Sequence, residues 1–327
     1  MRAHLEKVSL TNTQEQGRNP VRNPLDKYTE GPMPDVQDAS PTAVFENIDL
    51  DCISEWEDIN GEKLLAIPFD TPQRDPRWPG AMAGKILTAV AEITQAKEVD
   101  ICQPRPSEEA EKMRHIPITF LIHGLTSQQA ETLLERKIWS SQAITFRTTR
   151  FAPACPNFLF TIKGWKTITL KNVYPAVKQV WDSEETQEFT RSLIYAVPPA
   201  QRESVEKEIE HLINTMNIVR LDTKETGNTL TPRFNIYADS SKMSLDEVWS
   251  RIRLYFAKRT YASTTLGKGT IEQIPFTLCH GVDHPQGLCP IPDTPEWNGP
   301  KRDGNRERRN MRQRGSDPWD QRTHFRF

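Results

Sequence analysis

Hydrophobic positions divide the chain into a patterned middle and two polar ends. Between residues 59 and 153, short apolar runs of strand length alternate with segments whose apolar residues recur at the helical spacing of three and four. The strand-length runs lie at 63–69, 98–102, 116–123 and 143–151, and the helical segments at 81–96 and 126–138. Strand, helix, strand, strand, helix, strand is the split βαβ order, so residues 59–153 are predicted to form a ferredoxin-like or RRM-like α+β domain.

Residues 154–276 carry a similar pattern. Alternating apolar residues predict a strand at 158–163, and helical segments follow it before a pair of hairpin strands. The later helices are expected at 173–181, 186–196, from 203 onward and at 244–256, and the later strands at 218–223, 233–238 and 268–276. We therefore predict a second α+β domain here, which would make the body a duplicated βαββαβ fold.

Two capping boxes mark helix starts within this pattern. Thr126 precedes Gln129 by three residues, and Ser244 precedes Glu247 by the same spacing. In a capping box, the hydroxyl and the carboxyl or amide side chain each accept a backbone N–H at the helix start. Helices are therefore expected to begin at both places.

The two ends of the chain lack either period. Residues 1–58 and 293–327 are rich in polar side chains and proline, and the mean hydropathy of the chain is −0.64. Such composition cannot bury enough apolar surface to offset the entropy of ordering, so both ends are predicted to be disordered. Aromatic and aliphatic residues at 45–56 could still dock on the body as a short helix.

Charge is unevenly distributed along the chain. Residues 301–327 contain nine Lys or Arg and four Asp or Glu, a net charge of +5. The whole chain has a net charge of −2, so residues 1–300 carry −7. An acidic body with a basic end favours contact with a polyanion at that end, and the alternative is a solubilising extension.

Cysteine usage and hydropathy bear on the cellular compartment. The five cysteines are scattered and odd in number, which is not a disulfide framework. A reducing intracellular compartment, cytoplasmic and/or nuclear, is therefore expected. No secretory signal is recognised at the N-terminus, and no apolar run approaches the ~18 residues of a membrane span.

The strongest motif lies near the C-terminus, at residues 277–292. Cys279, His284 and Cys289 are separated by four residues each, which matches the last three ligands of a C-x2-C-x4-H-x4-C zinc knuckle. Phe276 stands where the first cysteine of that motif belongs, and His280 is a candidate for the missing ligand. The sequence thus predicts a degenerate knuckle that binds Zn²⁺, and the alternative is a loop that no longer holds a metal.

The segment after the knuckle is rich in arginine and aromatic residues. Arginines clamp phosphates and stack on bases, while aromatic rings offer further stacking planes. We expect single-stranded nucleic acid to contact Arg306, Arg308, Arg309, Arg312, Arg314 and Trp297. The alternatives are a solvated charged segment or a nuclear-import signal.

No catalytic constellation is found in the sequence. Residues 120–127 resemble the oxyanion segment of α/β-hydrolases, but the G-x-S-x-G nucleophile elbow that this fold requires is missing. Residues 80–85 resemble a phosphate-binding loop, but Pro79 and Ile86 occupy the positions of its first glycine and its hydroxyl. We therefore predict that the protein is not an enzyme.

The motif CHGVDHPQGLCPIPDTPEWNGP, together with FLIHGLTS and RFNIYAD, resembles the Gag-like proteins of fungal retroelements. The resemblance covers roughly residues 60–300. It implies binding of single-stranded RNA or DNA and self-association, with Cys279, His284 and Cys289 at positions of metal ligands. The rival hypothesis is a protein-interaction adaptor in which the knuckle is non-functional.

Overall fold

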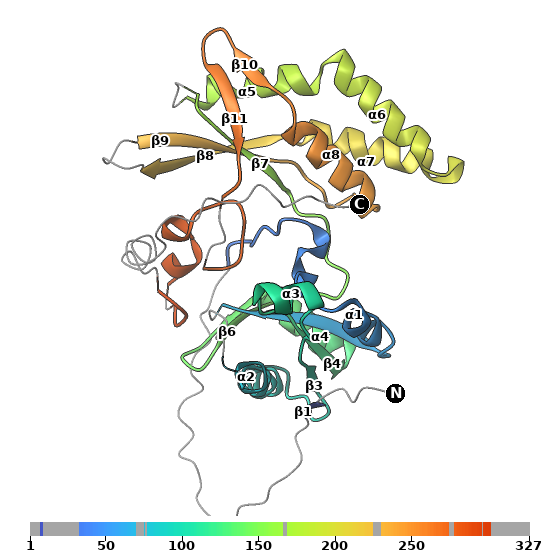
Figure 1. Ribbon diagram of the computed structural model, residues 1–327, viewed down its shortest axis with the longest axis vertical. Helices are drawn as coiled ribbons and strands as arrows, with labels where there is room; N and C mark the ends of the chain where they lie inside the picture. Colours follow the sequence, from blue (N-terminus) through green and yellow to red (C-terminus); the bar gives the residue numbers. More distant parts are fainter. Residues whose placement is uncertain are drawn as a thin grey trace, which may run out of the picture.

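The computed structural model describes residues 7–8, 33–69, 75, 77–165, 169–224, 230–274, 278–295 and 297–301. These residues form two antiparallel sheets, each with its own helices and its own buried core, so the fold class is α+β as predicted. Figure 1 shows the two sheets in separate halves of the molecule, with the knuckle segment between them.

The first sheet is formed mainly by residues 62–150. Its strands lie in the order β1 (Lys7–Val8), β3 (Asp100–Cys102), β4 (Phe120–Leu125), β2 (Glu62–Pro68), β6 (Thr145–Arg150) and β5 (Ile138–Ser140). One face is covered by α2 (Trp78–Thr94) and α4 (Ser127–Arg136), whose apolar sides pack on alternate strand residues such as Leu64 and Phe120. The predicted capping box of Thr126 and Gln129 is present at the start of α4.

The opposite face of this sheet is covered by the N-terminal segment. The 3-10 helix η1 (Pro41–Phe45) and α1 (Leu50–Glu57) bury Val44, Cys52 and Trp56 against strand residues that include Leu65 and Leu121. This corrects the expected disorder of residues 1–58 for their last part, because a fully buried tryptophan compensates for ordering a short helix. A further helix, α3 (Glu108–Met113), follows β3.

The second sheet is formed by residues 158–272. Its strands lie in the order β10 (Tyr261–Ser263), β11 (Gly267–Glu272), β7 (Phe158–Lys163), β9 (Leu230–Tyr237) and β8 (Asn217–Lys224). Its helices are α5 (Leu170–Trp181), α6 (Glu184–Ala196), η2 (Pro199–Gln201), α7 (Arg202–Asn214) and α8 (Asp246–Ala257). They share one core with the sheet, in which the rings of Trp181 and Phe256 stack 4.3 Å apart.

Both sheets place corresponding strands in corresponding positions. The first long strand of each unit lies between the third and the strand that ends the unit: β2 between β4 and β6, and β7 between β9 and β11. In each unit a three-residue strand, β5 or β10, precedes the last long strand and pairs on its outer side. The order of pairing is therefore the same in the two units.

The chain after β11 returns between the two sheets. This segment contains two short helices, η3 (Gln286–Leu288) and η4 (Ile291–Asp293). Its residues Cys279, Cys289 and Ile291 form an apolar cluster with Phe69 and Ile138 of the first unit. Within the described residues, no helix is long and apolar enough to cross a membrane.

Order also extends past the knuckle. Trp297, expected in a disordered tail at 293–327, packs 6.1 Å from Phe69 between ring centroids, and its Nε1 donates a hydrogen bond to Pro300 O. Gly299 lies so close to this indole that a Cβ there would sit 2.3 Å from it. The expected disorder is thus corrected for residues 293–301, apart from position 296, because an apolar ring anchors them to the body.

Candidate metal centre

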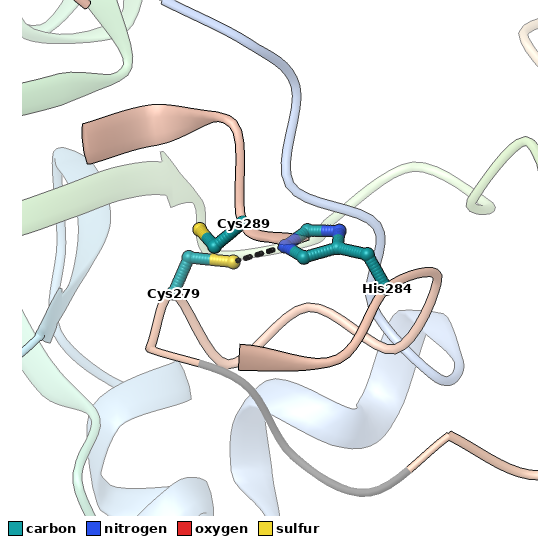
Figure 2. A group of neighbouring side chains, drawn as sticks. All are labelled: Cys279, His284 and Cys289. Atoms are coloured by element: carbon teal, nitrogen blue, oxygen red, sulfur yellow. Dashed lines mark hydrogen bonds between the residues drawn. The ribbon is translucent and has the colours of Figure 1, made fainter. Parts of the chain in front are cut away.

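Cys279, His284 and Cys289 converge in the loop that follows β11. One ligand atom from each lies within 4.8 Å of the others, and all three side chains are buried. Figure 2 shows the Cys279 sulfur directed at the imidazole, with 3.5 Å between Sγ and Nε2. Zinc bonds of ~2.3 Å to sulfur and ~2.0 Å to nitrogen, at a tetrahedral angle, place these atoms about 3.5 Å apart. The observed separation therefore fits a shared zinc ion.

Asp283 fixes the orientation of the His284 ring. His284 Nδ1 donates a hydrogen bond to Asp283 Oδ1 at 2.6 Å, which leaves Nε2 directed at Cys279. Tyr237, on β9, donates from its hydroxyl to Asp283 Oδ2 at 2.8 Å, and Asn235 of the same strand donates to the Asp283 carbonyl. A carboxylate behind a metal-binding histidine sets its tautomer and raises its basicity, and this arrangement is typical of metal sites.

The protonation of His284 follows from these contacts. Burial alone would lower the pKa of His284, but hydrogen bonds to Asp283 and Cys279 outweigh it and raise the pKa to about 9. Burial, together with the negative charge of Asp283, also raises the pKa of the Tyr237 hydroxyl, which therefore remains a donor. A metal ion at this site must displace the proton on His284 Nε2.

The backbone around Cys279 is shaped to enclose its sulfur. The N–H of Gly281 donates to Cys279 Sγ at 3.4 Å. A Cβ at Gly281 would lie 3.2 Å from that sulfur and 3.4 Å from Val36, so a larger residue would crowd both. A side chain at this position would therefore require its neighbours to move by a few tenths of an ångström.

The structure does not bring His280 into the ligand group. Its backbone has a φ of +63°, and its Nε2 donates to the carbonyl of Pro68 at 3.0 Å. Its ring contacts Phe69 edge-on. Burial, and then the nearby Arg147 charge, lowers the pKa of His280, which keeps the imidazole neutral. Its observed role is to attach the loop to the end of β2.

Residues 33–40 lie between both units and the loop that carries Cys279, His284 and Cys289. Val282 N donates to Gln37 O at 2.9 Å, and the Gln37 side chain accepts from the Phe158 N–H of β7 at 3.1 Å. Asp38 pairs with both terminal nitrogens of Arg147 on β6, and Arg253 of α8 donates to the carbonyl of Ala39. The loop is therefore joined to both sheets, directly and through this segment.

Sequence reasoning missed the residues that support the ligands. Asp283 could have been suspected, because a carboxylate next to a metal-binding histidine is a common partner. Tyr237, Gln37 and Asp38 carry no local signal, because they lie far from the motif in the sequence and reach it through the sheets.

Several predicted site residues lie outside the described residues. These are Phe276 and the five tail arginines Arg306, Arg308, Arg309, Arg312 and Arg314. Trp297 is described, and it is half-buried against Phe69. Within the described part of the chain, the metal-capable group thus consists of three ligands.

Comparison of the chain with models of protein families, with curated proteins and with solved structures finds no match. The assignment of function therefore depends on the residues and geometry described above.

Proposed function

We propose that the chain is a zinc-stabilised, Gag-like nucleic-acid-binding protein whose metal centre joins its two units. The proposed metal centre is supported by the convergence of Cys279, His284 and Cys289. Asp283 accepts a hydrogen bond from the ring nitrogen of His284 that faces away from Cys279. Two sulfurs and one imidazole are a donor set that suits zinc and disfavours the oxygen-seeking Mg²⁺ and Ca²⁺. A bound zinc ion would act as a structural cross-link within the loop.

The residues around the ligands support a structural role for the metal. Cys279 and Cys289 have no exposed surface, and the loop contacts Pro68, Tyr237 and Gln37 from three parts of the chain. The metal-capable side chains are thus enclosed by the body and are not presented to a nucleic acid. We therefore assign to the loop the joining of the two units, and to the tail that follows it the contact with nucleic acid.

The proposal includes a ferredoxin-like origin for both units. It is supported by the shared strand order and by the antiparallel pairing of β2 with β4 and β6, and of β7 with β9 and β11. A split βαβ unit places its first strand between its third and fourth in this way. Two such units would fit the duplication expected from the sequence.

Nucleic-acid contact is proposed for the basic tail, whose net charge of +5 contrasts with −7 for the remainder. Binding through phosphates should be salt-dependent, with a log–log slope of about −0.7 for each phosphate engaged on single strands. The basic tail begins at residue 301, four residues after Trp297, whose ring packs on Phe69 of the body.

Native mass spectrometry of the full-length protein, with and without chelator, tests the metal part. We expect one zinc per chain, lost in Cys279→Ser and retained in Cys155→Ser. The control thiol is also buried but contacts Asp246 at 3.5 Å, away from the cluster. Absence of zinc from the untreated protein, or equal loss in both variants, would refute the metal centre.

Fluorescence anisotropy with a single-stranded RNA oligonucleotide tests the nucleic-acid part. We expect replacement of the five tail arginines by alanine to weaken binding and to flatten the salt slope. A matched control replaces five exposed cations of the folded body, Arg77, Lys85, Lys97, Arg191 and Lys258. Equal losses in the two variants would refute the assignment to the tail.

A second candidate is the protein-interaction adaptor. It is favoured by the packing of Trp297 on Phe69, which holds against the body a ring that was expected to stack on bases. Zinc binding without any salt-sensitive binding of single strands would support this candidate over the first.

A further inference from the structure

The edges of the two sheets differ in length. Three of the four edge strands, β1, β5 and β10, are two or three residues long, whereas β8 at the edge of the second sheet has eight residues. Within the described residues β8 has one hydrogen-bonded neighbour, β9, and pairs with it along its whole length. Figure 1 shows the β8–β9 hairpin projecting from the sheet on the side opposite α6 and α7.

A long edge strand presents a row of backbone donors and acceptors, which makes it a template for another strand. Proteins usually blunt such edges by keeping them short, and β8 departs from this habit. Its Val219 side chain is 44% exposed, and Leu230 at the far end of β9 is 60% exposed. Helix α5 contacts β8 and carries two more exposed apolar side chains, Leu170 and Tyr174.

The charges of β8 favour a second copy of β8 as its partner, in a register centred on Leu221. Arg220 and Asp222 flank Leu221, are joined by an ion pair, and retain 28% and 51% of their side-chain exposure. If two copies of β8 pair antiparallel with Leu221 opposite Leu221, each Arg220 faces Asp222 of the other copy. A register centred on Arg220 or on Asp222 instead places like charges opposite each other, which destabilises a sheet. The edge is therefore self-complementary about Leu221.

We propose that β8 is a homodimerisation edge, where two copies of the chain pair antiparallel about Leu221 and join their second sheets into one continuous sheet. A contact with this twofold symmetry uses the same patch on both copies, as the reciprocal Arg220–Asp222 pairs require. The proposal does not depend on the metal centre, which lies at the other end of β9 beside Tyr237.

Analytical ultracentrifugation of the full-length protein over a wide concentration range tests this inference. We expect a concentration-dependent dimer. Arg220→Asp and Asp222→Arg each place like charges opposite each other twice per dimer, so each variant should dimerise about tenfold or more weakly. Both substitutions also remove the ion pair within one strand, but exposed pairs contribute little to folding.

An equimolar mixture of the two single variants separates the two effects. In a mixed dimer, the aspartates of one copy face the arginines of the other at both positions, so dimerisation should recover. The ion pair within each strand remains broken in the mixture, so recovery can come only from contact between copies. A wild-type chain that stays monomeric throughout, or a mixture that stays as weak as its components, overturns the proposal.

Cysteine cross-linking tests the register independently. Directly opposed residues of antiparallel strands have Cα atoms about 4.5–5.5 Å apart, which suits a disulfide. Leu221→Cys should therefore give a covalent dimer on mild oxidation. Val219→Cys should not, because its copies would be offset by four residues, or roughly 13 Å. The native cysteines are buried in the described structure, so cross-linking through Val219→Cys but not Leu221→Cys would overturn the register.

Discussion

Replacement of Asp283 by asparagine tests the metal centre through a residue that does not bind the metal. Asp283 accepts hydrogen bonds from His284 Nδ1 at 2.6 Å and from the Tyr237 hydroxyl at 2.8 Å, and the carboxylate is 13% exposed. Asparagine keeps the shape of the side chain and one acceptor oxygen but removes the negative charge. Loss of such a partner typically lowers metal affinity by about 10–100-fold, or roughly 1.4–2.7 kcal/mol.

The chain offers a matched control in a second Asp–His pair. Asp239 Oδ2 lies 2.7 Å from His211 Nε2, and the carboxylate is 41% exposed. Asp239→Asn should leave zinc affinity unchanged, because its histidine is not part of the metal-capable group.

Competition between the full-length protein and a chromophoric chelator measures zinc affinity in both variants. We expect the tenfold to hundredfold loss in Asp283→Asn alone. If Asp283→Asn binds zinc as tightly as the native chain, the carboxylate does not support a metal ligand. If both variants lose affinity equally, the effect is general destabilisation. Either result would refute the reasoning.

Three further outcomes are expected. Asp38→Ala should destabilise the protein by about 3–5 kcal/mol in urea unfolding, because it leaves the Arg147 charge buried without its partner, whereas Asp35→Ala, at an exposed pair, should cost under about 1 kcal/mol. Zinc affinity should rise as pH increases toward 9, because His284 must lose a proton to bind the metal and its pKa is raised to about 9. The metal-free protein should lose folding stability between pH ~6.5 and 9, because the folded state holds this proton more tightly than the unfolded state does. Zinc affinity and unfolding free energy that do not change across this pH range would contradict both expectations. Thr126→Ala should cost about 1 kcal/mol in the same unfolding assay, because the Gln129 N–H loses its cap, and no loss would show that the capping box does not stabilise α4.

Local patterns in the sequence predicted the types of most elements. The helix at 126–138 and its capping box were both predictable, because a cap joins residues three apart and needs nothing else. The second capping box did not form. Ser244 instead donates from its N–H and its hydroxyl to the carboxylate of Glu208 on α7, and the helix begins at Asp246. A carboxylate from another helix replaced the local partner.

The order of the strands within each sheet was only partly predictable. The hydrophobic pattern indicated which segments are strands, but the pairing of those strands joins segments far apart in the sequence. The docking of α1 on the first sheet was harder to predict, because its short length and polar surroundings resemble disorder. Trp56 is buried in an apolar cluster with residues of β2, β3 and β4, and this packing stabilises the short helix.

The candidate metal site was also partly predictable from the sequence and partly decided by the tertiary structure. The spacing of Cys279, His284 and Cys289 by itself pointed to the three side chains that form the metal-capable group, because these residues are only five apart in the sequence and share one loop. The sequence also suggested His280, and the tertiary structure placed its ring against Pro68 instead. That outcome depends on where β2 ends, which no local pattern encodes.

The sequence by itself thus determined the helices and strands with a clear hydrophobic period and the spacing of Cys279, His284 and Cys289, since both depend on residues that are close in sequence. The tertiary structure alone decided that the ligand loop would be a buried junction. Gln37 and Tyr237 are 200 residues apart in the sequence, and both contact the loop only because the two sheets and the segment at 33–40 assemble around it. Long-range contacts of this kind depend on packing, because the free energy that holds them comes from burial shared among distant segments.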